Sequence, residues 1–263
     1  MLGDFEMIQH RIDGAEPVTI YPIADVHFGA SEHMERAWSQ FCIDVLKEPR
    51  SYIILGGDLV NNATKTSVSN VYEEIYRPRE QKKFITEMLT PLRERILCAV
   101  TGNHERRSLK DVDSDITYDI MCKLDIEDRY RQNIAFMKIQ TGLVDKRQGA
   151  DSRPTYCFAV THGSGGGILT GGGVNRSERF AYVMDGVDAL IVGHTHKPWV
   201  TQPSKIKVDT RNNRVSVAPF KVISMSSWLE YSGYPVQKML LPTSHARQVI
   251  TLSGRKKEIR VEM

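Results

Sequence analysis

The sequence predicts an α/β fold built around a largely parallel sheet, on three observations. Short apolar runs rich in β-branched residues alternate with amphipathic helical patterns. The runs are apolar at consecutive positions, which is typical of strands buried on both faces. A His, Asp or Asn follows five of these runs, at the strand ends where ligands gather in open α/β sheets. With 263 residues and no linker-like segment, we expect one domain over residues 1–263.

The first two-thirds of the chain alternate between predicted strands and helices. The strands of the central sheet are predicted at residues 18–24, 52–55, 96–100, 156–160 and 189–192. Helices are predicted at residues 32–47, 79–90, 114–124 and 177–184. Ser31 is the expected N-cap of the first helix, and Ser177 the expected start of the last.

After residue 200 the pattern changes to short strands without intervening helices. These strands are predicted at residues 205–209, 214–219, 222–225, 248–252 and 258–261. Asn212 and Asn213 predict a hairpin turn between the first two. We therefore expect a second sheet whose strands come mostly from residues 200–263.

Composition and cysteine usage narrow the class of protein. The hydrophobic content of 41% and charged content of 25% are typical of a soluble globular domain, and a net charge of +3 is too small to indicate nucleic-acid binding. The four cysteines form no CxxC pair, so we expect buried free thiols in a reducing compartment. The N-terminus lacks the pattern of a signal peptide, and no apolar stretch approaches transmembrane length. We expect a cytoplasmic protein with no membrane contact.

Five short motifs follow strand ends and supply metal-binding side chains. They are Asp25-Val26-His27, Gly57-Asp58-Leu59, Gly102-Asn103-His104-Glu105, Thr161-His162-Gly163 and Gly193-His194-Thr195-His196. Any one alone reads as an ordinary turn, but five of the eight histidines fall in them. Their oxygen and nitrogen donors suit divalent ions of intermediate hardness. The number of donors suits two adjacent ions sharing one carboxylate, a pair that activates water and clamps a phosphoryl group.

These residues resemble the calcineurin-like metallophosphoesterases. The pattern of that family is D-x-H, G-D, G-N-H-[DE], a His after a strand, and G-H-x-H, and every part is present in order from Asp25 to His196. The resemblance implies a four-layer α/β/β/α sandwich with a dimetal site at the carboxyl ends of the strands. It also implies a hydrolase that breaks a phosphoester bond with a hydroxide activated by two divalent metal ions.

The resemblance assigns a ligand set to each metal ion. Asp25, His27, Asp58 and His196 bind one ion, Asp58, Asn103, His162 and His194 bind the second, and Asp58 bridges the two. In a β-like segment, residues two apart share a side, so each paired motif can point both of its ligands at one centre. Several imidazoles favour Mn, Fe, Zn or Ni over Ca or Mg, and the resemblance favours Mn²⁺.

His104 is the motif histidine that neither metal ion needs. The resemblance places it beside the phosphate as the catalytic residue, where it protonates the leaving oxygen or stabilises its developing charge. The alternative is that His104 only orients Asn103.

The substrate class is open between phosphodiesters and phosphomonoesters. Protein phosphatases of this superfamily continue G-D-x-V-D-R-G, whereas residues 57–63 read G-D-L-V-N-N-A, without that Asp and Arg. Glu105 is nevertheless the residue that those phosphatases carry. The chain looks more like the phosphodiesterase and DNA-repair-nuclease branch and like proteins encoded by bacteriophages, for which the location would be the host cytoplasm. We expect a phosphodiester substrate, with DNA the first hypothesis. The alternatives are a phosphomonoesterase, such as a Ser/Thr protein phosphatase, and a non-catalytic scaffold.

Four arginines are candidates for contacts with the substrate phosphate. Arg106 and Arg107 follow His104 directly, and Arg176 and Arg179 follow a glycine-rich segment at residues 163–173. Each could equally be a solvated surface residue. The glycine-rich segment has no P-loop lysine, so we expect either a mobile loop over the metal site or an ordinary surface loop. The sequence leaves the oligomeric state open, with a homodimer among the alternatives.

Overall fold

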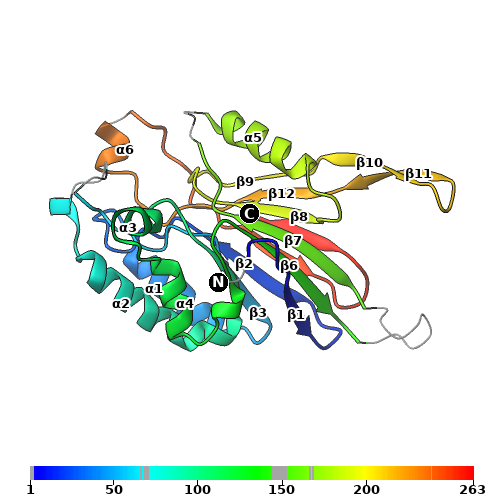
Figure 1. The fold of residues 1–263 in the computed structure, drawn as a ribbon, viewed down its shortest axis with the longest axis horizontal. Coiled ribbons are helices and arrows are strands. Elements are labelled where there is room, and N and C mark those ends of the chain that lie inside the picture. Colours follow the sequence, from blue (N-terminus) through cyan, green and yellow to red (C-terminus); the bar gives the residue numbers. More distant parts are fainter. Residues whose placement is uncertain are drawn as a thin grey trace.

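Two six-stranded sheets pack against each other, and helices cover their outer faces (Figure 1). The structure is a computed structural model that describes residues 3–65, 67, 71–143, 153–165, 167, 169–237 and 239–263. One apolar core lies between the sheets, and one lies under the helices on each side. This is the four-layer α/β/β/α arrangement, so the predicted fold class is confirmed.

The first sheet supplies three of the five motifs. Its strand order is β14 (Ile259–Glu262), β13 (Val249–Leu252), β2 (Val18–Ile23), β3 (Ser51–Leu55), β4 (Ile96–Val100) and β5 (Tyr130–Arg131). Strands β2 to β5 run parallel, and every residue of β4 is buried because both faces of this sheet are covered. The carboxyl ends of β2, β3 and β4 therefore lie at one edge of the sheet.

The second sheet supplies the other two motifs. Its strand order is β1 (Ile8–Ile12), β6 (Ile134–Thr141), β7 (Thr155–Thr161), β8 (Ala189–Val192), β12 (Lys221–Ser224) and β9 (Trp199–Thr201). Strands β7 and β8 run parallel and end beside each other, with Thr161 opposite Val192. His162 and His194 follow these two ends.

The prediction that the second sheet comes mostly from residues 200–263 is wrong. Of the later strands, only β12 joins that sheet, whereas β13 and β14 extend the first sheet. Strands β7 and β8, which we had placed in the central parallel sheet, belong to the second sheet together with β1 and β6, which the sequence did not reveal. A run of buried residues shows that a strand is covered but does not show which strand lies beside it.

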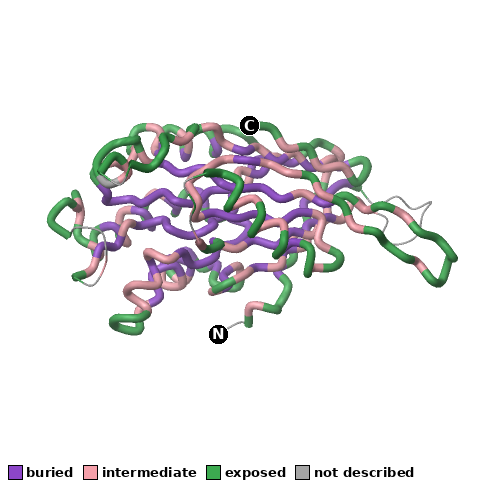
Figure 2. Tube along the Cα trace, turned by 90° about the horizontal axis from the view of Figure 1, so that it is seen from above, coloured by how far each residue is buried: buried purple, intermediate pink, exposed green. Residues whose placement is uncertain are grey.

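The hairpin predicted around Asn212 and Asn213 is confirmed. It joins β10 (Ser204–Asp209) to β11 (Arg214–Pro219), and Asn213 has a left-handed backbone with φ of 50°. The hairpin projects from the body as a separate two-stranded sheet, and its residues are mostly exposed (Figure 2).

Three helices pack on the first sheet and one on the second. The helices are α1 (Glu35–Lys47), α2 (Pro78–Leu89), α3 (Glu105–Val112), α4 (Ile116–Lys123), α5 (Thr170–Tyr182) and α6 (Tyr234–Gln237), with 3-10 turns at Val71–Glu73, Thr90–Arg95 and Glu127–Arg129. Trp38, Ile85 and Ile120 bury α1, α2 and α4 against the first sheet, and Ala181 buries α5 against the second. Helix α1 starts at Glu35 after Met34, so Ser31 is not its N-cap.

Two further observations concern the cysteines and the lengths of the helices. Cys42, Cys98, Cys122 and Cys157 are free thiols, as predicted, but only Cys42 and Cys98 are buried, while Cys122 and Cys157 are partly exposed. Within the described residues, no helix combines the length and the apolar character that crossing a membrane would need.

The packing of the sheet core predicts that two Ile→Ala substitutions lower the free energy of unfolding by very different amounts. Ile191 on β8 is fully buried, whereas Ile206 on β10 is 77% exposed. We expect Ile191→Ala to lower the free energy of unfolding by about 2–5 kcal/mol, because it removes packed methyl groups and leaves a cavity. The same truncation at Ile206 should change it by less than about 1 kcal/mol. Urea denaturation followed by circular dichroism measures both, and equal losses would contradict this account of the core.

Candidate metal centre

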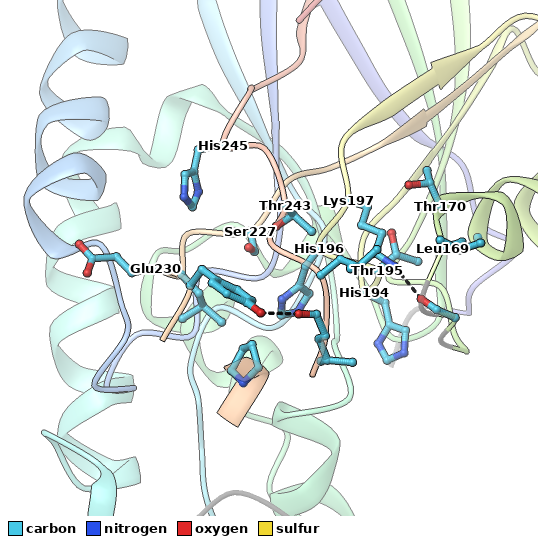
Figure 3. Close-up of a pocket in the computed structure, with 17 residues that line it drawn as sticks. Leu169, Thr170, His194, Thr195, His196, Lys197, Ser227, Glu230, Thr243 and His245 are labelled. Atoms are coloured by element: carbon cyan, nitrogen blue, oxygen red, sulfur yellow. Dashed lines mark hydrogen bonds between the residues drawn. The ribbon is translucent and has the colours of Figure 1, made fainter. Parts of the chain in front are cut away.

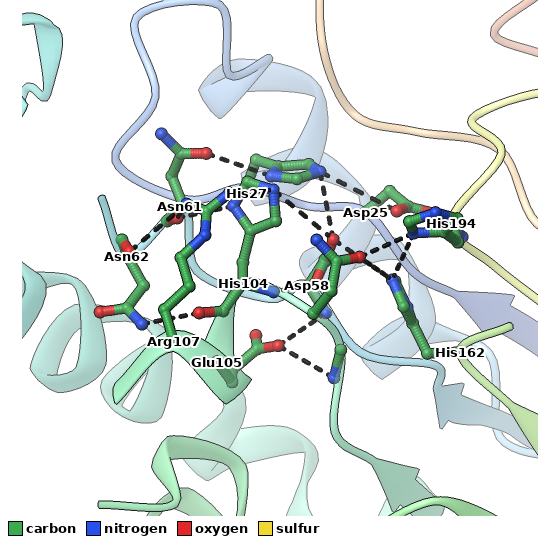
Figure 4. A network of polar contacts seen from close by, with 12 residues as sticks. Asp25, His27, Asp58, Asn61, Asn62, His104, Glu105, Arg107, His162 and His194 are labelled. Carbon is green, nitrogen blue, oxygen red and sulfur yellow. Dashed lines mark hydrogen bonds and ion pairs between the residues drawn. The ribbon is translucent and has the colours of Figure 1, made fainter. Parts of the chain in front are cut away.

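The five motifs meet where the two sheets present their strand ends. Each motif begins within three residues of the end of β2, β3, β4, β7 or β8. The structure brings together all seven predicted ligands. Three groups have ligand atoms within 4.8 Å of one another, namely Asp25, His27 and His196; His27, Asp58 and His104; and Asp58, His162 and His194. Oδ1 of Asn103 lies within 2.9 Å of both His162 and His194. In Figure 4 the side chains of Asp25, His27, His104, His162 and His194 lie around Asp58.

Five of these ligands have a left-handed backbone. The φ angles are 53° at Asp25, 48° at His27, 52° at Asp58, 68° at His194 and 55° at His196. We had expected β-like segments that share a side, and that expectation is wrong, although both paired motifs do converge. Non-glycine residues rarely adopt positive φ, and such strained residues gather at functional sites.

The first ligand group contains Asp25, His27 and His196, with Asp58 beside it. Nε2 of His27 lies 3.3 Å from Nε2 of His196, and Nε2 of His196 lies 3.2 Å from Oδ1 of Asp25. Oδ2 of Asp58 lies 3.8 Å from Nε2 of His27. Oδ1 of Asp25 is buried and accepts no hydrogen bond from the described residues, while Oδ2 accepts one from the backbone N–H of His194.

The second ligand group contains Asp58, Asn103, His162 and His194. Oδ1 of Asn103 lies 2.9 Å from Nε2 of His162 and 2.7 Å from Nδ1 of His194. Oδ2 of Asp58 lies 3.3 Å from Nε2 of His162, so the same carboxylate oxygen faces both groups. Asp58 is therefore placed to bridge two ions, as the resemblance implied.

The donor set fits divalent cations. Nδ1 of His162 lies 2.8 Å from the Gly56 carbonyl, and Nδ1 of His27 lies 3.2 Å from Oδ1 of Asn61. With Nδ1 as the donor in both bonds, each Nε2 keeps a lone pair that points at the centre. Ring nitrogens and carboxylate oxygens that face one another suit a shared cation, which would take the place of any proton held between them.

The charges at the centre also favour bound cations. Burial by itself would raise the pKa of Asp58, but the imidazoles of His162 and His104 hold it well below its usual range. Burial would lower the pKa of His162, but the Asp58 carboxylate raises it to about 10. The buried carboxylates thus attract positive charge, which metal ions would supply.

His104 lies beside the ligands and contacts Arg107. Its Nδ1 lies 2.6 Å from the Asn61 carbonyl, and its Nε2 lies 3.0 Å from a guanidinium nitrogen of Arg107 and 3.8 Å from Oδ2 of Asp58. Burial lowers the pKa of His104, which Asp58 partly opposes. With Nδ1 as the donor, Nε2 accepts a hydrogen bond from Arg107 and faces the centre.

Glu105 has a role that the sequence did not reveal. Its buried carboxylate accepts hydrogen bonds from the backbone N–H groups of Asp58, Leu59, Val60 and Gly102, at 2.6–3.2 Å. Glu105 therefore ties together the loops after β3 and β4 that carry Asp58 and Asn103. Burial and the Asp58 carboxylate raise the pKa of Glu105 to about 7. The position of Glu105 next to His104 in the motif was the sequence feature from which this role could have been predicted.

The four candidate arginines have different surroundings. Arg107 lines a cavity beside the centre, and Arg176 donates to the carbonyl of Ser164, two residues after His162. Arg106 donates to the carbonyl of Gln132 and to Oδ1 of Asn133, and it lines neither cavity described below. Arg179 is exposed on α5 and also lines neither. Arg107 is therefore the arginine best placed to contact substrate.

The glycine-rich segment is partly helical. Helix α5 begins at Thr170, seven residues before the predicted start, and contains Gly171, Gly172 and Gly173. Residues 166 and 168 lie outside the described part of the chain. Gly167 and Gly173 line a cavity beside the metal centre.

Two cavities open beside the centre and share His196. The His104 cavity, about 490 Å³, is lined by His27, His104 and Arg107. The His194 cavity, about 420 Å³, is lined by His194, Lys197 and Ser227 (Figure 3). Leu229, Glu230, Pro235 and Leu240 line both, so these four residues form a common wall.

Comparisons with known proteins agree with this geometry. A family model for calcineurin-like phosphoesterases matches residues 18–198. A search of curated proteins found no match.

Two solved structures are similar at low identity. One is a conserved uncharacterized protein, a predicted phosphoesterase, from Streptococcus pneumoniae TIGR4, at 11% identity and a TM-score of 0.36 over 94% of this chain and 99% of that chain. The other is a metallophosphoesterase from Sphaerobacter thermophilus, at 13% identity and a TM-score of 0.39 over 93% of this chain and 87% of that chain.

The contacts of Glu105 predict that its charge controls metal affinity. In Glu105→Gln, an NH₂ group would face backbone N–H donors, which costs about 1–3 kcal/mol and displaces the two loops. We expect Mn²⁺ affinity to fall at least about tenfold, measured by isothermal titration calorimetry on the folded protein. Glu87→Gln is the control, because Glu87 is exposed on α2 and paired only with Lys83 at 3.8 Å. Unchanged affinity in Glu105→Gln would refute the role.

Proposed function

Because the chain belongs to the calcineurin-like phosphoesterase family and is a hydrolase of phosphoester bonds, we propose that it is a phosphodiesterase acting on nucleotide phosphodiesters, DNA among them. The observation that carries this proposal is the pair of cavities that meet at His196. A phosphodiester has an organic group on each side of phosphorus, whereas a phosphomonoester has only one. Two cavities that adjoin at His196 match the two organic groups of the diester.

The positive charge around the centre also suits a diester. In this chain Asn61 and Asn62 occupy the positions of the phosphatase Asp and Arg. The Asn61 amide contacts His27 and Glu74, and the Asn62 amide donates to the His104 carbonyl. This loop therefore offers the substrate no cation, and among the residues that the structure describes Arg107 is the only Lys or Arg lining the His104 cavity. One guanidinium matches the single negative charge of a diester better than the double charge of a monoester.

Two divalent ions, which we propose to be Mn²⁺, would be held by the two ligand groups. When bound, they supply an activated water nucleophile and neutralise charge on the phosphoryl oxygens. The chain itself orients His27 and His162 through the hydrogen bonds of their Nδ1 atoms. His104 and Arg107 lie together beside Asp58. With a proton on Nε2 as well as on Nδ1, His104 would donate to the leaving oxygen, and together with Arg107 it would stabilise the negative charge that develops there.

The proposal predicts a substrate order. With Mn²⁺, we expect hydrolysis of bis-p-nitrophenyl phosphate to exceed that of p-nitrophenyl phosphate, and labelled single- and double-stranded DNA are tested in parallel. Asp58→Asn should abolish activity, because the amide cannot bridge two cations with one negative charge. Absorbance at the p-nitrophenolate band and gel electrophoresis provide the readouts. Hydrolysis of the monoester alone would replace the proposal with a phosphatase, and a metal-loaded but inactive protein would favour a scaffold.

His104 and the ligand histidines should respond differently to truncation. His104→Ala should keep both metal ions and lose at least about 100-fold in kcat, because His104 lies beside the ligands and acts on the substrate. His194→Ala, the comparison variant, should weaken metal binding itself. Metal stoichiometry by elemental analysis, measured alongside kcat, separates the two effects. Loss of a metal ion in His104→Ala would show that the residue only orients Asn103.

A further inference from the structure

The two cavities differ in the group that could act on a departing oxygen. His104 and Arg107 line only the His104 cavity, whereas His194, a predicted metal ligand, lines only the His194 cavity. His196 lies where the two meet. A phosphate bound at the centre would therefore have one ester oxygen toward His104 and the other toward the His194 cavity. The two ester groups of a diester are not equivalent in this site.

The His104 cavity is acidic apart from Arg107. Glu32, Glu73 and Glu230 line it. Glu230 lines both cavities, whereas Glu32 and Glu73 line the His104 cavity alone and would repel a further phosphate there, because like charges disfavour each other. The organic group on this side is therefore expected to carry no phosphate of its own.

The His194 cavity combines apolar walls with a few polar groups. Leu169, Leu240 and Leu241 contribute apolar surface, and Lys197, Ser227, Thr170 and Thr243 contribute polar atoms. His245, to which the sequence gave no role, lines it as well. Its volume of about 420 Å³ lies within the range of small-molecule sites. Lys197 already donates to the Gly167 carbonyl. A sugar and a heterocyclic base would match both the hydroxyls of Thr170, Ser227 and Thr243 and the apolar surface, whereas a hydrocarbon chain would match the apolar surface alone.

From this asymmetry we infer that the His194 cavity binds the nucleoside that keeps the phosphate, and that the His104 cavity binds the alcohol that leaves. This assignment rests on the proposed phosphodiesterase function. In the step, a bond forms from the water-derived oxygen to phosphorus, and the bond from phosphorus to the oxygen facing His104 breaks. The electron pair of the broken bond stays on that oxygen, which takes up a proton from His104 and departs as the alcohol. The proton that the attacking water gives up passes to the solvent, and His104 regains a proton from the solvent. The product in the His194 cavity is a nucleoside monophosphate.

The methyl ester of thymidine 5′-phosphate tests the orientation. Both of its ester bonds lead to alkyl alcohols, so the intrinsic leaving abilities are similar and the site decides which bond breaks. We expect thymidine 5′-phosphate and methanol, separated and quantified by liquid chromatography. Thymidine and methyl phosphate as the products would overturn the assignment. So would failure to cleave this ester by a preparation that hydrolyses bis-p-nitrophenyl phosphate, whereas failure on both substrates would instead reject the proposed function.

Two matched tryptophan substitutions test which cavity holds the nucleoside. Leu241 lines only the His194 cavity, while Val236, on the same segment, is 51% exposed and lines neither cavity. Leu241→Trp should raise KM for the thymidine ester at least about tenfold, because the indole fills the space for the base. Val236→Trp should leave KM unchanged. Circular dichroism checks that both variants fold, and Leu241→Ala provides a second variant if the larger residue does not fit. An unchanged KM in a folded Leu241 variant would overturn the inference.

Discussion

The buried carboxylate of Asp58 is the constraint on which the rest of the centre depends. It is 1% exposed, lies within 4 Å of imidazoles on three different loops, and accepts the backbone N–H of His104 through its other oxygen. Removing a carboxylate from water is costly unless positive charge and hydrogen-bond donors surround it. The loops after β2, β3, β4 and β7 therefore have to approach one another, and a centre with two cations satisfies the charge that they enclose.

The approach of these loops requires unusual backbone and close packing. Gly102 lies so near Asp58 that an added Cβ would come within 2.1 Å of Oδ1 and 2.2 Å of the backbone nitrogen. Ligands such as Asp25 and His27 accept left-handed backbone, which their own propensity does not favour. Glu105 offsets part of this cost by accepting four backbone N–H groups that would otherwise be buried without partners. The strained backbone at the metal-ligand positions is thus compensated by the backbone hydrogen bonds that Glu105 accepts.

The residues that surround the metal centre differ between the two cavities. The ligand groups are similar in composition, yet His104 and Arg107 stand on one side, and apolar residues such as Leu241 on the other. Leu229, Glu230, Pro235 and Leu240 line both cavities, and the hydroxyl of Tyr231 donates a hydrogen bond to the Leu240 carbonyl. None of these residues is a predicted metal ligand, so the walls of the cavities and the metal centre are formed by different residues.

The sequence by itself determined which side chains are available to bind metal ions, because Asp, Asn and His that directly follow buried strands form a pattern that is visible locally in the chain. It predicted all seven side chains that meet at the centre, the α/β class, and the hairpin at Asn212 and Asn213. Only the tertiary structure decided which sheet β7, β8 and β13 join, because patterns of buried residues do not specify partners. It also decided that Glu105 accepts four backbone hydrogen bonds and that Arg106 and Arg107 have different surroundings. The two cavities that share Leu240 were likewise visible only in the tertiary structure. These features depend on contacts between residues far apart in the chain, for which no local pattern exists.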